Sequence, residues 1–162
     1  MKIDKNELRE YLSKMPEDTK VYFGADSERI RIDGVWYVDY LLVIIVHEGG
    51  NKGAKIFGEI QRERDYDKNL SRPRNRMMTE VYKISELYLN LKDAIDEYEV
   101  EIHLDINPDL KYGSSVACKE AIGYIRGTCM MTPVVKPHSF VASNVADALK
   151  RLLPGKKEIC NV

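Results

Sequence analysis

Residues 21–28 read VYFGADSE, a short apolar run that ends on an acid. Val21 to Phe23 favour a pleated, buried environment, while the small residues that follow let another backbone or a ligand approach closely. We therefore predict a strand over Lys20 to Ala25, with Asp26 at its tip. Functional sites in open α/β sheets form at the carboxyl ends of strands, so Asp26 is a candidate site residue. The alternative is an aspartate that starts a turn or caps a local N–H.

Size and composition favour one soluble domain. The chain has 162 residues, a formal net charge of -1 and an ordinary apolar fraction, which suits a single domain over 1–162 with a core from about 20 to 153. A balanced charge gives no global attraction to nucleic acid. Three widely spaced cysteines fit neither a disulfide framework nor a zinc site, and no signal peptide or membrane span is evident, so we expect a cytoplasmic protein with no membrane partner.

Hydrophobic periodicity predicts alternating helices and strands along the chain. The first half contains a helix and then three strands joined by turns, and Asp33-Gly34 is a strong hairpin signal. The second half alternates between helix and strand. The predicted helices cover Asp4–Met15, Asn75–Glu97, Ser114–Arg126 (with Gly127 as the stop) and Ser139–Leu153, and the predicted strands cover Lys20–Ala25, Val35–Val46, Ala54–Ile60, Val100–Ile106 and Cys129–Val135.

This order predicts an α/β fold with a five-stranded mixed sheet flanked by helices. A three-strand antiparallel meander is followed by two parallel strands, and an extra helix precedes the sheet. Because parallel strands need right-handed crossovers, the tips of the first and fourth strands come together, which makes Asp26 and Asp105 neighbours. The crossover helix carries Glu80 near its start and the last helix carries Asp147, and both can reach the same end of the sheet.

The segment from Arg62 to Arg76 is the most basic candidate surface. This segment contains six basic residues and three acidic ones. We interpret it as a linker that is either a solvated loop or a phosphate-contacting segment next to a site. Its basic residues are Arg62, Arg64, Lys68, Arg72, Arg74 and Arg76.

The pattern of acids resembles the ribonuclease H-like superfamily, in which acids lie on strand one, on the first long helix, at the end of strand four and on the last helix. Three blocks, GADS at 24–27, HLDI at 103–106 and KPHSFVASNVAD at 136–147, look like the signature blocks of the bacterial YkuK family of predicted ribonuclease H-like nucleases. The resemblance spans about Lys20 to Arg151. Glu28 and the Arg-rich segment depart from the shared pattern.

The resemblance implies a site for two Mg²⁺ or Mn²⁺ ions held by Asp26, Glu80, Asp105 and Asp147. Hard carboxylate oxygens suit these cations, and two ions about 3.5–4 Å apart stabilise the attacking and leaving oxygens of an in-line phosphoryl displacement. Asp26 is expected to bridge the ions, with Asp105 on the water-activating ion, Glu80 on the leaving-group ion and Asp147 completing the site. Lys136 is expected to stabilise developing charge.

Further residues are predicted to contact the nucleic-acid substrate. Ser139 and Ser143 either cap the last helix or touch a phosphate. The full set of predicted substrate contacts is Ser27, Arg72, Arg74, Arg76, Ser139 and Ser143.

The predicted function is therefore a metal-dependent nuclease that cuts RNA, an RNA–DNA hybrid or structured DNA and leaves a 5′-phosphate and a 3′-hydroxyl. The alternative is an inactive ribonuclease H-like module that binds nucleic acid or serves in an assembly. The presence of all four acids favours the enzyme. An actin-like ATPase is disfavoured because the chain is too short for duplicated domains and has no matching Gly-rich phosphate loop.

Overall fold

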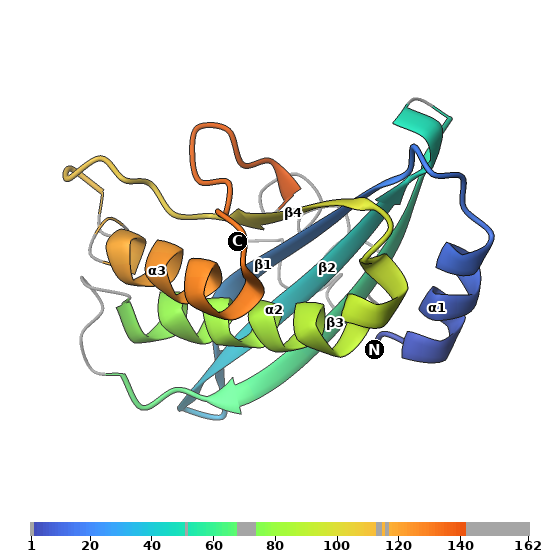
Figure 1. Cartoon of the computed structure of the whole chain (residues 1–162). Coiled ribbons are helices and arrows are strands. Elements are labelled where there is room, and N and C mark those ends of the chain that lie inside the picture. The colour runs from blue at the N-terminus through green and yellow to red at the C-terminus, as the bar shows by residue number, and fades with distance from the viewer. Residues whose placement is uncertain (1, 51, 68–73, 113–114, 116, 142–162) are drawn as a thin grey trace.

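The computed structural model describes residues 2–50, 52–67, 74–112, 115 and 117–141, and within them one mixed sheet with helices packed on it (Figure 1). The described elements are α1 (Lys5–Ser13), β1 (Lys20–Ile32), β2 (Val35–His47), η1 (Glu48–Gly50), β3 (Ala54–Arg64), α2 (Arg74–Ile95), β4 (Glu99–Leu104) and α3 (Cys118–Cys129). None of these helices combines the length and the hydrophobicity that crossing a bilayer requires.

The first three strands form the predicted antiparallel meander, but they are longer than predicted. β1 pairs with β2 from Lys20↔His47 to Ile32↔Val35, so the strand runs straight through Asp26. The Asp33-Gly34 turn was predicted correctly. Its residues have φ of 49° and 81°, the left-handed values of a two-residue hairpin turn whose twist matches that of its strands. Asp26 is therefore not at a strand tip, because β2 supplies hydrogen-bonding partners beyond it.

The sheet order is β3-β2-β1-β4, with β4 parallel to β1. The predicted fifth strand, Cys129–Val135, is wrong within the described residues. Cys129 ends α3, and only Val134 forms a bridge, parallel to His103. Its amide donates to Ile102 O at 2.8 Å and its carbonyl accepts from Leu104 N at 2.9 Å. Pro133 and Pro137 flank this position and have no N–H to extend the ladder.

The helices of the structure lie where they were predicted, but some of them begin or end at other residues. Asp4 caps α1, since its carboxylate accepts from the amides of Asn6 and Glu7. α3 continues past the predicted stop at Gly127 and ends at Cys129, where Met130 adopts a left-handed φ of 58°. Glycine costs a helix interior only about 1 kcal/mol, and the buried Ile125 and Cys129 hold this last turn in place. Ser139 and Phe140 are irregular, and most of the predicted last helix lies outside the described residues.

The core lies between the sheet and α2, which crosses one face diagonally with α3 beside it (Figure 1). Alternate residues of β1 and β4 point to this face because side chains alternate across a strand. They pack against the apolar stripe of α2. The stripe consists of Met78, Val81, Ile84, Leu87, Tyr88, Leu91 and Ile95. The start of α2 is thereby fixed near the middle of β1.

Truncation of Ile84 tests this packing. Its side chain is fully buried between α2 and the sheet, so we expect Ile84→Ala to lower the free energy of unfolding by about 2–5 kcal/mol. Leu89→Ala on the same helix is the matched control, because Leu89 is 44% exposed and should change stability by less than about 0.5 kcal/mol. Urea denaturation followed by circular dichroism gives both values. Equal losses in the two variants would contradict this placement of α2.

Candidate functional site

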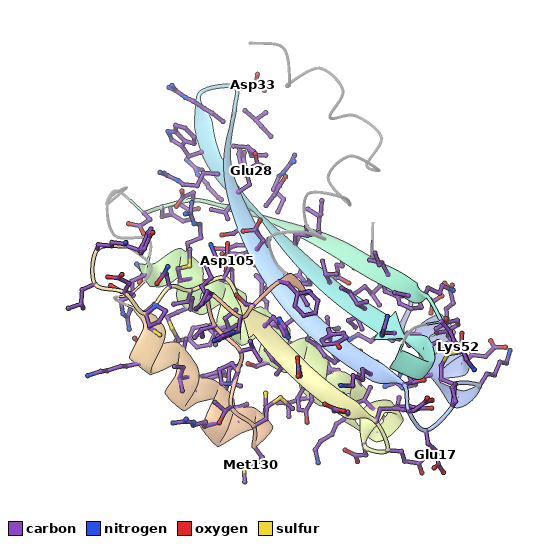
Figure 2. All side chains as sticks on the ribbon, turned by 90° about the horizontal axis from the view of Figure 1, so that it is seen from above. Glu17, Glu28, Asp33, Lys52, Asp105 and Met130 are labelled. Carbon is purple, nitrogen blue, oxygen red and sulfur yellow. The ribbon has the colours of Figure 1, made fainter. Side chains whose placement is uncertain are left out.

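Asp26 and Asp105 follow one another across neighbouring strands. The parallel pairing of β1 with β4 ends at Ala25↔Leu104; Asp26 is the next residue of β1, and Asp105 is the first residue after β4. Both carboxylates therefore leave the sheet on the same side, where the β1–β4 pairing stops. Figure 2 shows Asp105 at this place, near the start of α2.

Glu80 reaches the same region from the first turns of α2. It is only 4% exposed, and the hydroxyl of Ser27 donates a hydrogen bond to its Oε1. Burial, together with the charges of Asp26 and Asp105, raises the pKa of Glu80 to about 8, while the Ser27 hydrogen bond and the guanidinium of Arg76 act against the shift. Three carboxyl groups from β1, α2 and β4 thus interact electrostatically at one place.

Lys136 lies against the third acid. Its ammonium nitrogen is 2.5 Å from Asp105 Oδ1, and its backbone amide donates to Ile106 O. Asp105 Oδ1 is shielded from solvent and accepts no hydrogen bond from the described residues. Its contact with Lys136 is therefore an ion pair without the geometry of a hydrogen bond. The Asp105 carboxylate is thus already beside one cationic group, the Lys136 ammonium.

Three of the predicted substrate contacts bond to other residues of the protein: Ser27, Arg74 and Ser139. The Ser27 amide donates to Asp26 Oδ1 at 2.9 Å, which orients this carboxylate. Arg74 pairs with Glu120 of α3. Arg76 keeps a buried Nε without a hydrogen bond among the described residues. The amide of Ser139 donates to Val135 O. Arg72, Ser143 and the fourth predicted metal ligand, Asp147, lie outside the described residues.

The Arg-rich segment is not the linker that the sequence predicts. Arg62 and Arg64 end β3, whereas Arg74 and Arg76 begin α2. Arg62 makes two hydrogen bonds to the buried Asp39, at 2.7 and 2.9 Å, on the adjacent strand. Glu63 pairs with Lys83 of α2. The ion pairs of Arg62 and Glu63 therefore link the edge strand β3 to β2 and to α2.

His103, two residues before Asp105, forms contacts that hold the neighbouring segments together. It is buried, its Nδ1 accepts from the Phe140 amide at 3.2 Å, and its Nε2 lies 2.7 Å from Glu101. Because Nδ1 accepts a hydrogen bond, the ring proton resides on Nε2, which donates to the carboxylate. The rings of Tyr22 and Phe140 pack edge-on against the imidazole. His103 thus joins β4 to the segment that follows Lys136.

The three acids fit the chemistry of a divalent metal, although they do not enclose an ion as they stand. Across the described residues, no three acidic, histidine or cysteine side chains converge as ready-made ligands. The donors are nonetheless hard carboxylate oxygens, one of them buried without a hydrogen bond, and their repulsion is relieved by a cation. Asp26, Glu80 and Asp105 therefore form a candidate site for Mg²⁺ or Mn²⁺.

A second surface beside these acids was not predicted from the sequence. The first strand was predicted to end at Ala25, yet β1 continues to Ile32 and forms an arm with β2. The alternation Arg29-Ile30-Arg31-Ile32, mirrored by Val35-Trp36-Tyr37 across the turn, is the period-2 signal that could have predicted it.

The fold, one mixed sheet with helices packed on it, is consistent with a ribonuclease H-like protein. A family model described as Ribonuclease H-like matches residues 5–151, so the chain belongs to this family. The match confirms the resemblance to the YkuK family. No curated protein and no solved structure matches the chain significantly. Membership indicates a nuclease-like or nucleic-acid-binding module.

Proposed function

We propose that this protein is a divalent-metal-dependent nuclease that hydrolyses phosphodiester bonds in RNA, RNA–DNA hybrid or structured DNA. The observation that carries the proposal is that Asp26, Glu80 and Asp105, three acids distant in sequence, interact where the β1–β4 pairing ends. A buried glutamate with a pKa near 8 beside two aspartates is costly for a purely structural site. A cation offsets that cost.

Asp26, Glu80 and Asp105 would hold the metal, together with Asp147 as the sequence predicts. Bound there as two ions, Mg²⁺ or Mn²⁺ supplies Lewis-acid stabilisation of the attacking and leaving oxygens in an in-line displacement at phosphorus, with 5′-phosphate and 3′-hydroxyl products. Ser27 orients the carboxyl groups of Asp26 and Glu80 through its amide and its hydroxyl. Lys136, next to Asp105, is positioned to exchange this carboxylate for a substrate phosphate.

The test is cleavage of a panel of end-labelled substrates: hybrid, duplex RNA, duplex DNA, a four-way junction and single strands. Each is incubated with Mg²⁺, Mn²⁺, Ca²⁺ or EDTA, and the product termini are identified by ligation and phosphatase treatment. We expect cleavage of at least one substrate with Mg²⁺ or Mn²⁺ and none with EDTA. Cleavage that persists in EDTA would contradict the proposal.

A second candidate is a module that binds nucleic acid without cutting it. The observation in its favour is that two of the acids already have internal partners, Glu80 with Ser27 and Asp105 with Lys136. Tight binding across the panel, with no cleavage under any metal, would favour this alternative.

A further inference from the structure

The β1–β2 hairpin extends beyond the parallel part of the sheet as an arm, defined here as residues 28–38 (Figure 2). Figure 2 shows it running outward from Glu28 to Asp33, past the level of Asp105. The pairing of β3 with β2 reaches only to Tyr37↔Arg64, so the end of the arm has two strands. A two-stranded extension adds surface to the molecule without adding to the core, which points to a role in contacts.

The outer part of the arm and the end of β3 present exposed aromatic rings together with arginines. Trp36 is 41% exposed and Tyr66, just after β3, is 77% exposed. Both rings line one hollow of about 310 Å³. The guanidinium of Arg29 lies 4.9 Å and that of Arg31 5.7 Å from the indole centroid, and the guanidinium of Arg64 lies 5.3 Å from the centroid of Tyr66.

This hollow continues toward the carboxylates. A second hollow of about 490 Å³ shares residues 64–67 with the first and reaches Arg76 and Thr79, the residue before Glu80. We call the two together the trough. Arg76, whose buried Nε has no hydrogen bond from the part of the chain that the structure describes, lines the second hollow and interacts electrostatically with Glu80. The trough therefore runs from Arg76 and Thr79, in the first turns of α2, past the end of β3 to the arm.

The lining of the trough includes three acids, Glu63, Asp65 and Asp67, together with arginines. Arg29 pairs with Asp65, and Lys83 pairs with Glu63, so these two acids are neutralised within the fold. Arg31, Arg64 and Arg76 have no ion pair among the described residues. A phosphate chain would find Arg64 and Arg76 in the lining of the trough and Arg31 beside Trp36.

We propose that the trough binds a single-stranded part of the nucleic-acid substrate. Its bases stack on Trp36 and Tyr66, and its phosphates contact Arg31, Arg64 and Arg76. Aromatic rings beside arginines suit this ligand because every base has a π-face and every linkage carries a charge. This inference rests on the proposed nuclease function, and it specifies the substrate as one with an unpaired extension next to the cleaved segment.

Binding is measured in EDTA, so that no cleavage occurs, with the full chain and two sets of fluorescein-labelled hybrids. One set is blunt, and the other carries a single-stranded extension of about six nucleotides at either end. Trp36 is the single tryptophan of the chain, so its intrinsic fluorescence reports directly on the arm. We expect tighter binding of the extended hybrids and quenching of the tryptophan emission by them alone.

Three variants and a control sharpen the test. Trp36→Ala and Tyr66→Ala are expected to weaken binding of extended hybrids by about tenfold or more, and blunt hybrids by less than about twofold. Arg31→Ala should lower the slope of log K against log salt concentration by about 0.7. Tyr124→Ala is the control, since Tyr124 is 37% exposed on α3, away from the arm, and should change neither affinity. Circular dichroism and Trp36→Phe, which retains a ring, check that folding is intact.

The outcomes separate this inference from the proposed function. Equal affinity for blunt and extended hybrids, unquenched Trp36, or equal losses in Tyr124→Ala and Trp36→Ala would overturn the inference, even if metal-dependent cleavage is found. Extension-dependent binding that Trp36→Ala abolishes would support it, even if no substrate is cut and the nuclease proposal fails.

Discussion

Asp26→Asn is expected to abolish phosphodiester hydrolysis while making the metal-free protein more stable. Asp26 adjoins Asp105 across the β1–β4 junction, and its charge raises the pKa of the buried Glu80. An amide removes one of three crowded negative charges, so the repulsion within the site falls. The same change weakens cation binding, and the Lewis-acid contribution that is lost amounts to several kcal/mol, or about 10³-fold in rate.

The matched control is Asp33→Asn, which removes one negative charge from the tip of the arm. Asp33 has a φ of 49°, which asparagine adopts readily, so folding should be unaffected. Initial cleavage rates at saturating Mg²⁺ and urea denaturation in EDTA give the two readouts. An Asp26→Asn variant that keeps its rate, or one that loses stability as well as activity, would show that Asp26 is structural and not a metal ligand.

Stability in the absence of metal is expected to fall as the pH rises from 5 to 8.5, and Glu80 is the reason. Burial raises the pKa of Glu80 from 4.5 to about 8, so the native state binds more protons than the unfolded state between these values. The stabilisation is fully present below about pH 4.5 and is lost as the pH passes through about 8. The whole effect is at most about 5 kcal/mol.

Glu80→Gln removes this dependence, because a carboxamide resembles the protonated acid and still accepts from Ser27. We expect the variant to exceed the wild type in stability at pH 8.5 and to match it near pH 5. Glu86→Gln, an exposed position on the same helix, should follow the wild-type curve. Urea denaturation in EDTA at several pH values measures all three, and parallel curves for Glu80→Gln and wild type would refute the assignment.

Millimolar Mg²⁺ should reverse the loss at pH 8.5 in the wild type, because an ion that binds only the native state stabilises it. Glu80→Gln should gain less from the ion, since one ligand is missing. Stabilisation of equal size in both proteins would place the cation elsewhere.

The elements that local pattern specifies were predicted well. The apolar stripe of α2 recurs at steps of three and four, and the Asp33-Gly34 turn was recognised from two residues. The pairing of Asp26 with Asp105 followed from connectivity, because a parallel β4 beside β1 sets its register at the junction. These features depend on near neighbours in sequence or on the handedness of crossovers.

The predictions that were wrong concern features that depend on residues far away in the sequence. β1 continues past Asp26 because β2 offers thirteen paired positions, whereas the predicted fifth strand is reduced to the Val134 bridge because prolines interrupt its amides. Gly127 did not end α3, since the buried Ile125 and Cys129 hold the last turn against the core. Neither a partner strand nor a core contact is visible in a window of sequence.

The sequence by itself determined the α/β element order, the meander and the family, along with the identities of the acids. Only the tertiary structure decided that Glu80 is buried beside Ser27 and that Trp36 and Tyr66 share one hollow. It also decided that Arg62 and Arg74 form ion pairs, whereas Arg31 and Arg64 form none with any described residue. Periodicity reports which face a residue occupies in its own element. The burial, the pKa and the ion pairs of a residue depend on which other elements pack against that face. Long-range packing alone determines which elements those are.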